Sequence, residues 1–304
     1  MFRHRLPLLL GLFILLLLGL RLSHMLAFDR LQAHRRTVSP WTEIFQGVSY
    51  LSKRLPDDPQ GRGMMYLIRV DLNVPGTDFH SRPYFQNESR PGAGLYHLEY
   101  PWQFVEREHL AAAVNGTFFG PVQSPPSVPG LPRTFVFYGS LAQQDGLIVM
   151  DHQAVGGRVD GTFIWLDQDR TPHMRVDRYQ RIIQTLQASR FAVFNWYPLV
   201  LNGQPGRDTE PGAHTPDPKL HARTVLGVDT HKRLLYLACF EHASLLTAAR
   251  ELIREGVPDA IACDGGGSSC LTLGDQARHI RPGTVLGGLR PVGAIFGIRA
   301  DPLP

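Results

Sequence analysis

The sequence is organised around Cys263-Asp264-Gly265-Gly266-Gly267-Ser268-Ser269-Cys270, called the glycine loop below. A short apolar run, Ala260-Ile261-Ala262, precedes it and is typical of a buried strand. Three successive glycines indicate a turn too tight for residues that carry a Cβ. Backbone N–H groups converge in such a turn, and the hydroxyls of Ser268 and Ser269 lie beside them. The loop therefore predicts a cradle for a phosphate or another oxyanion.

Asp264 is the unusual member of the glycine loop, because a carboxylate repels an anion at short range. It predicts a ligand that carries both a phosphate and a reacting carbon or hydroxyl, or a divalent cation that bridges the two charges. No other cofactor is expected. The alternative is a purely structural turn, in which Asp264 makes an Asx hydrogen bond and Ser268 caps a helix.

Alternating strand-like segments dominate the rest of the sequence. They are separated by turns rich in Gly, Asp and Pro, which is typical of hairpins. A single strand and two hairpins are predicted over residues 64–72, 162–166 with 173–176, and 225–228 with 234–237.

Two amphipathic helices complete the pattern. One extends from Ser244 to Gly256 and leads into the strand before Asp264, and the other covers residues 176–186 with Asp177 as its cap. Strands outnumber helices. The sequence therefore predicts an α+β fold with a mixed, largely antiparallel sheet and flanking helices, in a single main domain.

The N-terminus indicates export. A basic start precedes Leu8–Leu20, which contains only Leu, Ile, Phe and Gly. This pattern is typical of a signal peptide or an uncleaved signal anchor, and residues 6–28 are long enough to span a bilayer. We expect residues 1–36 to be this signal, residues 37–62 to be a linker and residues 63–304 to be the main domain. That domain would lie on the periplasmic or extracellular face, anchored to the membrane.

The positive charge of the chain does not indicate nucleic-acid binding. The net charge is +4, but residues 1–36 contain six Arg and one Asp, so the remainder has a net charge of about −1. Its basic residues form no stripe, and a nucleic-acid partner is therefore not expected.

Three cysteines, Cys239, Cys263 and Cys270, lie close to the glycine loop in the sequence. In an oxidising compartment a bridge between Cys263 and Cys270 would close the loop, and one between Cys239 and Cys263 would join two strands. The third alternative is three buried thiols without a bridge.

Several common site types are excluded by their motifs. No Lys follows the triple glycine, as a P-loop requires, and the loop does not fit the G-x-S-x-G pattern of serine hydrolases. Zinc motifs of the H-E-x-x-H or C-x-x-C type are absent from the sequence.

Two further segments accompany the glycine loop: Val114-Asn115-Gly116-Thr117-Phe118-Phe119-Gly120 and His221-Ala222-Arg223-Thr224-Val225-Leu226-Gly227-Val228-Asp229. Taken singly, each has an ordinary structural interpretation, because Asn-Gly is a common hairpin turn and an arginine at a strand start is commonly ion-paired. Their order and spacing relative to the loop are more informative.

In this order the three segments resemble the phosphodiester glycosidase family. Supporting matches run through residues 69–72, 198–203 and 290–292, so the resemblance covers roughly residues 64–300. Two positions depart from the family pattern. Thr117 stands where the family often has a second glycine, and Cys263 stands where it has an aliphatic residue.

The resemblance implies hydrolysis of a sugar-1-phosphodiester in an envelope or extracellular glycan. Arg223 would grip the phosphate, since its guanidinium is always charged and forms two parallel hydrogen bonds. Asp264 would act at the anomeric carbon, and Asn115 would bind a sugar hydroxyl or the phosphate. His221 would be an acid/base partner or an ordinary histidine. The substrate-binding set would be Gly265, Gly266, Gly267, Ser268, Ser269 and Thr224.

Two other functions remain open at this point. A non-catalytic envelope protein could use the same loop to bind a glycan phosphate, although Asp264 would hinder such binding. A phosphodiesterase could cut the P–O bond in place of the C–O bond.

Overall fold

Antiparallel sheets make up most of the computed structural model, which describes residues 38–56, 63–81, 85–86, 94–122, 138–144, 146–150, 152–156, 160–207 and 220–304. These residues belong to one compact unit, Val38–Pro304. The predicted membrane anchor, residues 6–28, lies outside the described residues. Within the described part, no helix has the length and apolar character needed to cross a membrane.

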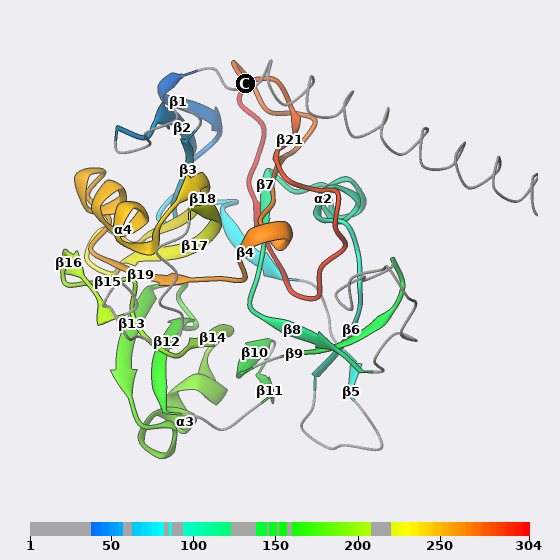
Figure 1. Cartoon of the computed structure of the whole chain (residues 1–304), viewed down its shortest axis with the longest axis vertical. Coiled ribbons are helices and arrows are strands. Elements are labelled where there is room, and N and C mark those ends of the chain that lie inside the picture. The colour runs from blue at the N-terminus through cyan, green and yellow to red at the C-terminus, as the bar shows by residue number, and fades with distance from the viewer. Residues whose placement is uncertain are drawn as a thin grey trace, which may run out of the picture. The chain divides into compact units, whose positions relative to one another are not determined.

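The large sheet has eight strands and carries the chain to the glycine loop (Figure 1). Its strands, in spatial order, are β1 (Ser39–Phe45), β2 (Val48–Arg54), β3 (Met64–Asp71), β18 (Leu234–Ala243), β17 (His221–Asp229), β19 (Asp259–Ala262), β15 (Val200–Leu201) and β16 (Gln204–Pro205).

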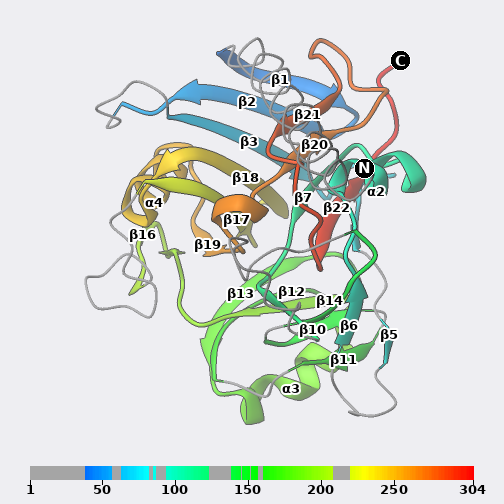
Figure 2. The same ribbon diagram turned by 45° about the vertical axis from the view of Figure 1, so that its right-hand side comes forward.

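Three smaller sheets complete the β structure (Figure 2). The second sheet contains β11 (Gln153–Val155), β10 (Ile148–Met150), β14 (Phe191–Asn195), β12 (Gly161–Leu166) and β13 (Pro172–Asp177). The third contains β21 (Gly283–Leu286), β20 (Leu271–Leu273), β7 (Ala112–Asn115), β22 (Ile295–Arg299) and β4 (Asp78–Ser81). The fourth contains β5 (Phe85–Gln86), β6 (Gly94–His97), β9 (Leu141–Gln144) and β8 (Phe119–Pro121).

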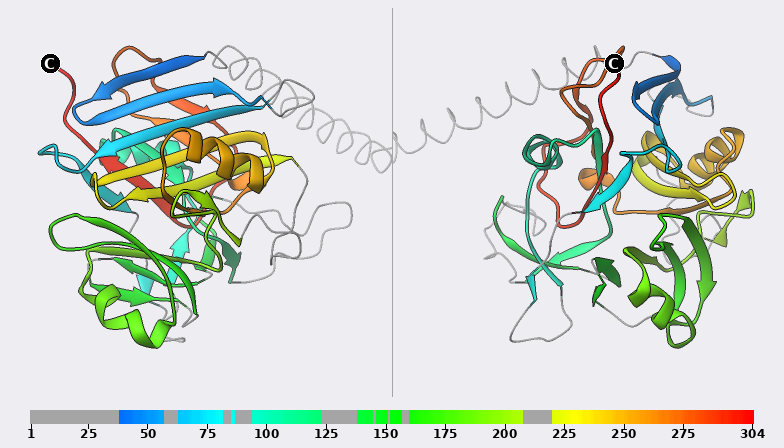
Figure 3. Two further views of the ribbon diagram at one scale, coloured as in Figure 1. Left: turned by 90° about the vertical axis from the view of Figure 1, so that its left-hand side faces the viewer. Right: turned by 180° about the vertical axis from the view of Figure 1, so that it is seen from behind.

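Each sheet buries a face against another layer (Figure 3). One face of the large sheet meets the second and third sheets in a central core that includes Ile68, Ile164 and Phe296. Its other face packs against helix α4 (Leu245–Arg254). Helix α3 (Tyr179–Ala188) covers the second sheet, and α2 (Pro101–Glu108) packs on the third. The central strands β17 and β18 are therefore buried on both faces, as a strand that positions a site needs to be.

The predicted hairpins and the helix before the glycine loop are confirmed. Strands β12 with β13 and β17 with β18 form the two hairpins, and α4 begins after Ser244, whose hydroxyl accepts a hydrogen bond from Thr247 N at 3.0 Å. The sheet is not mixed, because every strand pair in the described ranges is antiparallel. The molecule is also richer in strand than the α+β prediction implied.

Two local predictions are wrong. Residues 39–54, expected within a linker, form β1 and β2, because the apolar side chains of Ile44, Val48 and Tyr50 join the central core. Asp177 does not cap helix α3; Asp160, at the start of the preceding hairpin, accepts the hydrogen bond from Tyr179 N at 2.9 Å.

The three cysteines are free thiols, so neither disulfide considered above is formed. Each is buried. Cys239 Sγ donates to the carbonyl of Cys270 at 3.4 Å. Burial raises the pKa of Cys263 and that of Cys270 to about 12, which keeps both thiols protonated at neutral pH.

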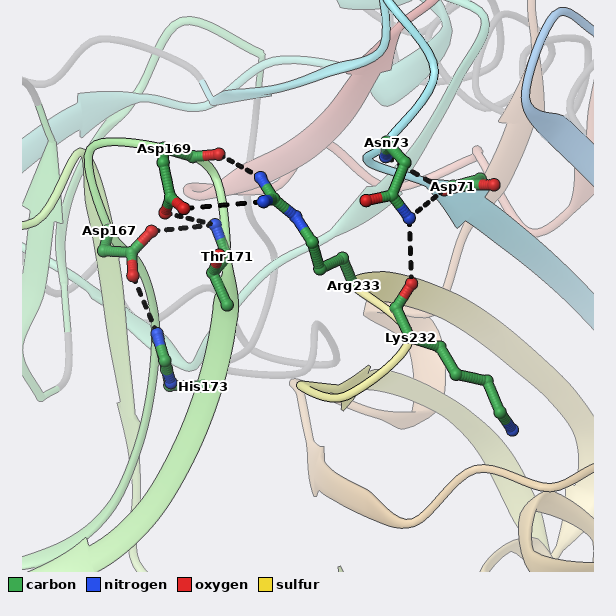
Figure 4. A network of polar contacts seen from close by, with 8 residues as sticks. All are labelled: Asp71, Asn73, Asp167, Asp169, Thr171, His173, Lys232 and Arg233. Carbon is green, nitrogen blue, oxygen red and sulfur yellow. Dashed lines mark hydrogen bonds and ion pairs between the residues drawn. The ribbon is translucent and has the colours of Figure 1, made fainter.

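A polar network joins the tip of the β12–β13 hairpin to the turn between β17 and β18 (Figure 4). Arg233 pairs with the carboxylate of Asp169 at 3.4 Å and also donates to its carbonyl. Asn73 extends the network by donating to the carbonyl of the residue before Arg233. A hydrogen bond between the side chains of Asp167 and Asp169, hydrogen bonds from Thr171 and the charge of Arg233 together lower the pKa of Asp169 to about 2. The second sheet is thereby held to the large sheet at its tip.

Candidate functional site

The glycine loop crosses from the large sheet to the third sheet. Strand β19 runs antiparallel to β17, and Cys263 N continues that pairing by donating to the carbonyl of Thr224 at 2.8 Å. The chain then forms the short 3-10 helix η2 (Gly266–Ser268) and enters β20, which pairs with β7. Gly266 has a φ of 60°, a left-handed conformation that favours glycine. Figures 1 and 2 show this turn between β17 and β7.

The side-chain amide of Asn115 joins the segments that meet under the loop. Its Nδ2 donates to the carbonyl of Asp264 at 2.6 Å and to that of Gly116 at 3.5 Å. Its Oδ1 accepts from the hydroxyl of Thr224 at 2.6 Å and from Cys270 N at 2.9 Å. Both amide hydrogens and both acceptor positions are therefore used within the protein.

Asn115 and Thr224, both predicted to contact substrate, lie beneath the loop. The two side chains are at most 1 % exposed. The structure thus gives both residues a positioning role, since they fix the backbone at the two ends of the glycine loop. A direct contact between Asn115 and substrate would require one of its four hydrogen bonds to exchange.

Asp264 is partly buried, and its backbone N–H donates to the carbonyl of Gly116 at 3.0 Å. Burial raises the pKa of this carboxyl group above its ordinary value. The Ser268 hydroxyl, the charge of Arg290 and the N–H of Gly265 act in the opposite direction and favour the carboxylate. Asp264 is therefore a partly desolvated carboxyl group whose charge depends on its neighbours, as catalytic carboxyl groups commonly are.

Two arginines flank the glycine loop. Arg223 lies beside its first glycine, because a Cβ at Gly265 would be 3.8 Å from Arg223 Nη1. Arg290 lies beside the third, because a Cβ at Gly267 would be 3.8 Å from Arg290 Nη1. The Arg290 guanidinium also sits over the ring of Phe119, 5.6 Å from its centroid. A Cβ at Gly265 would also come within 3.2 Å of the carbonyl of Ala222, whereas a Cβ at Gly267 would make only ordinary van der Waals contact with Arg290.

A β-bulge sets the direction of Arg223. The register of β17 and β18 shifts between His221 and Arg223, so two residues of β18 face Ala222 alone. One of them, His242, has a φ of 48°. Arg223 Nε donates to the carbonyl of Ala243 at 3.1 Å, which fixes the side chain along the end of the strand. Bulges of this kind commonly re-aim a side chain next to an active site.

Three polar atoms at the loop have no hydrogen-bond partner within the described part of the chain: Ser268 Oγ, Ser269 Oγ and Arg290 Nε. All three atoms are buried. Ser268 Oγ lies close enough to the Asp264 carboxylate to favour its charged form, but the contact lacks good hydrogen-bond geometry. Buried polar groups without partners are rare, so their gathering at one loop indicates donors available to a ligand.

The predicted site residues are mostly brought together. The glycines, the two serines, Asp264 and Arg223 meet at the loop, with Asn115 and Thr224 beneath it. His221 lies at the first residue of β17, partly exposed and opposite Ala243. No group of three or more His, Cys, Asp or Glu side chains able to hold a metal occurs in the parts of the chain described. Asp264 already faces the charge of Arg290, so these residues alone do not form a cation site.

Arg290 is a site residue that the sequence analysis did not identify. The sequence carries its signal in Arg290-Pro291-Val292, which matches the family pattern, but nothing in the local sequence shows that this segment returns to the glycine loop. The contact with Gly267 and the stacking on Phe119 reveal it.

Comparisons with known proteins agree with this fold. A family model described as phosphodiester glycosidase matches residues 108–299. The zebrafish N-acetylglucosamine-1-phosphodiester alpha-N-acetylglucosaminidase catalytic domain, auto-inhibited by its pro-peptide, has a TM-score of 0.57 at 16% identity, over 88% of this chain and 87% of that one. A hypothetical protein from Synechocystis has a TM-score of 0.53 at 12% identity, over 84% of this chain and 62% of that one. At such identities the two structures show a shared fold alone. Comparison with curated protein sequences gave no match.

Replacement of Asn115 tests its positioning role. We expect Asn115→Ala to lower the free energy of unfolding by about 2–4 kcal/mol, because Thr224 and Cys270 N would be left buried without their acceptor. Urea denaturation followed by circular dichroism measures this. Gln204→Ala, an exposed amide on β16, is the control and should change stability by less than about 0.5 kcal/mol. An Asn115→Ala protein with the wild-type unfolding midpoint would show that the four hydrogen bonds do not support the loop.

Proposed function

The chain belongs to the phosphodiester glycosidase family, as its motifs predicted, and from this premise we propose that it hydrolyses a sugar-1-phosphodiester at the glycine loop. Family membership supports a hydrolase of the phosphodiester glycosidase type. The observation that carries the finer proposal is the position of one partly desolvated carboxyl group, Asp264, between two arginines.

The arginines suit the phosphate part of such a substrate. A phosphodiester carries one negative charge, and its phosphate gains negative charge as the anomeric C–O bond breaks. Arg223 and Arg290, on either side of the loop, are placed to neutralise that charge together with the N–H groups of Gly266 and Gly267. The unpartnered hydroxyls of Ser268 and Ser269 supply two further donors. This set stabilises the transition state more than the ground state, as catalysis requires.

Asp264 suits the sugar part. In its ionised form it stabilises positive charge at the anomeric carbon, or attacks that carbon, while the phosphate leaves with the bonding electron pair. Water then supplies the oxygen of the new sugar hydroxyl, and its second proton goes to solvent or to the leaving phosphate. The products are a free sugar and a phosphate monoester of the other group.

The zebrafish enzyme is named for its action on an N-acetylglucosamine-1-phosphodiester. For this chain we propose the wider class, a sugar-1-phosphodiester in a glycan outside the cytoplasm. The basic start and the apolar run Leu8–Leu20 support this location.

Asp264→Asn tests the role of the carboxylate. We expect this change to lower kcat by about 10² or more with little change in KM, because the carboxylate acts mainly in the transition state. Hydrolysis of a p-nitrophenyl phosphodiester of N-acetylglucosamine-1-phosphate measures it, with the exposed Asp275→Asn as the matched control.

The same substrate in ¹⁸O-labelled water distinguishes the mechanisms. Label in the sugar indicates C–O cleavage, whereas label in the phosphate indicates a P–O cleaving phosphodiesterase and contradicts the proposal. Binding of substrate without turnover by any protein preparation would instead favour a glycan-phosphate binding protein.

Arg290 should control the pH dependence of the reaction. Burial raises the pKa of Asp264 and the charge of Arg290 lowers it, so removal of that charge in Arg290→Gln raises the pKa further. The active form needs the carboxylate. The acidic limb of the kcat/KM profile should therefore move to higher pH, and kcat/KM at neutral pH should fall at least about tenfold.

Arg290→Lys retains the charge and should leave the limb close to its wild-type position. The exposed Arg281→Gln is a second control. If the acidic limb of the kcat/KM profile did not move in Arg290→Gln, ionisation of Asp264 would not be what sets that limb.

A fusion experiment tests the location. Alkaline phosphatase, which needs an oxidising compartment, should be active in bacteria when it is fused after Pro304. The activity should be lost when residues 1–36 are deleted. Activity that persists without these residues would show that the N-terminal segment does not direct export.

A further inference from the structure

The two arginines beside the glycine loop are held in different ways. Arg223 Nε donates to the carbonyl of Ala243 at 3.1 Å. Among the described residues, no hydrogen bond or ion pair holds the side chain of Arg290, and its Nε is buried without a partner. An arginine side chain has many rotamers, so one that lacks polar partners needs another contact to keep its charge in one place. The ring of Phe119 is that contact, with the guanidinium carbon 5.6 Å from its centroid.

The ring of Phe119 is itself fixed by its surroundings. Phe119 begins strand β8 and pairs with Gln144 of β9. Its side chain packs against the buried cluster that includes Val292 and Ile295. A Cβ at Gly293 would be 3.2 Å from both Cβ and Cγ of Phe119, so the absence of a side chain there lets the two segments approach closely. The ring therefore has a defined place beside the segment that carries Arg290.

The segment that ends in Phe119 also positions Asp264. The carbonyl of Gly116 accepts from Asp264 N at 3.0 Å, and Gly116 N donates to the carbonyl of Ala294 at 2.8 Å. The short span from Gly116 to Phe119 thus contacts the backbone of the reacting carboxyl group at one end and the guanidinium of Arg290 at the other. The relative placement of these two charges depends on this span.

The place of the Arg290 charge matters because it acts on Asp264 through space. It favours the carboxylate and opposes the effect of burial on the pKa of Asp264. The other titratable or charged groups near this carboxyl group are the Cys263 thiol, which burial keeps neutral, and Arg223, which lies beside Gly265. Coulomb attraction weakens as two charges separate, so a guanidinium that moved away from the loop would favour the carboxylate less.

We propose that Phe119 is a positioning residue of the reaction, whose ring holds the Arg290 guanidinium at the glycine loop and so sets the field around Asp264 and a bound phosphate. Phe119 acts through Arg290 and not on the substrate. The inference rests on the proposed function, since the charge that Phe119 holds is one of the two assigned to the phosphate. It gives a role to the second phenylalanine of the segment that begins at Val114.

Removal of the ring tests the proposal. Phe119→Leu keeps an apolar side chain but has no aromatic face for the guanidinium. We expect the pKa of Asp264 to rise, and the acidic limb of the kcat/KM profile to move to higher pH, in the same direction as in Arg290→Gln but less far. At neutral pH, kcat/KM should fall about two- to fivefold, the effect of one cation–π contact at a partly exposed site. Phe119→Tyr, which retains a ring, should keep the wild-type pKa and limb.

Two readouts separate the position of Arg290 from turnover. Carboxyl ¹³C NMR of the full chain, labelled at its Asp residues, measures the pKa directly, and the Asp264 signal is the one that is absent from Asp264→Asn. Hydrolysis of the p-nitrophenyl substrate across pH measures the limb. In the Arg290→Gln background, Phe119→Leu should change neither quantity further, because the charge that the ring holds is already gone.

Phe104→Leu is the matched control. Phe104 belongs to the same buried cluster and carries a guanidinium of its own, that of Arg107, 5.4 Å from its centroid. This change should lower the unfolding midpoint measured by circular dichroism and leave the pKa of Asp264 and the limb in place.

The outcomes distinguish the inference from the proposed function. If Phe119→Leu loses stability but keeps the wild-type pKa of Asp264 and the wild-type limb, its ring serves packing alone and the inference is overturned. If Phe119→Leu raises that pKa while the wild-type protein hydrolyses no sugar-1-phosphodiester, the proposed function fails and the hold of Phe119 on Arg290 remains. Hydrolysis by a protein whose Asp264 pKa does not respond to Phe119 gives the reverse result.

Discussion

The hydrogen bonds of the Asn115 amide are the constraint on which the site depends. They connect the end of β7 to the middle of β17 and to both ends of the glycine loop, which lie 109 to 155 residues further along the chain. Because the amide is buried, each of these bonds replaces one that water would otherwise make, and none can be dropped without cost. The loop can therefore hold an unusual backbone course that its own short sequence could not maintain.

Electrostatics in the site follow from this placement. The course of the loop backbone shields Asp264 from much of the solvent, and this burial opposes ionisation of its carboxyl group. Arg290 comes from a distant segment, stacks on Phe119 and restores part of the preference for the charged form. Arg223 is held at the opposite end of the loop by a bulge and by the carbonyl of Ala243. The pKa of Asp264 thus stays above its ordinary value because of burial, while the charge of Arg290 limits the rise.

The sequence revealed the parts of the fold that depend on local pattern. The hairpins, helix α4 with its Ser244 cap and the glycine loop each carry their signal within a few residues, and all three appear in the structure. Long-range packing decides the remainder. Strands β1 and β2 have a mixed polar pattern and become strands because β3 and the central core receive them. Asp160 replaces Asp177 as the cap of α3 because the hairpin brings it back to the helix. Arg290 likewise meets the glycine loop because long-range packing brings its segment back to the loop.

The second sheet packs on the large sheet in the central core, and polar contacts add to this packing at the hairpin tip, through Arg233 and Asp169, and at the other end, through Asn195 and Ala262. Neither of these polar contacts uses a residue of the Asn115 network. The exposed surface of β12, β13 and α3 can therefore change by mutation while the backbone of the glycine loop keeps its course.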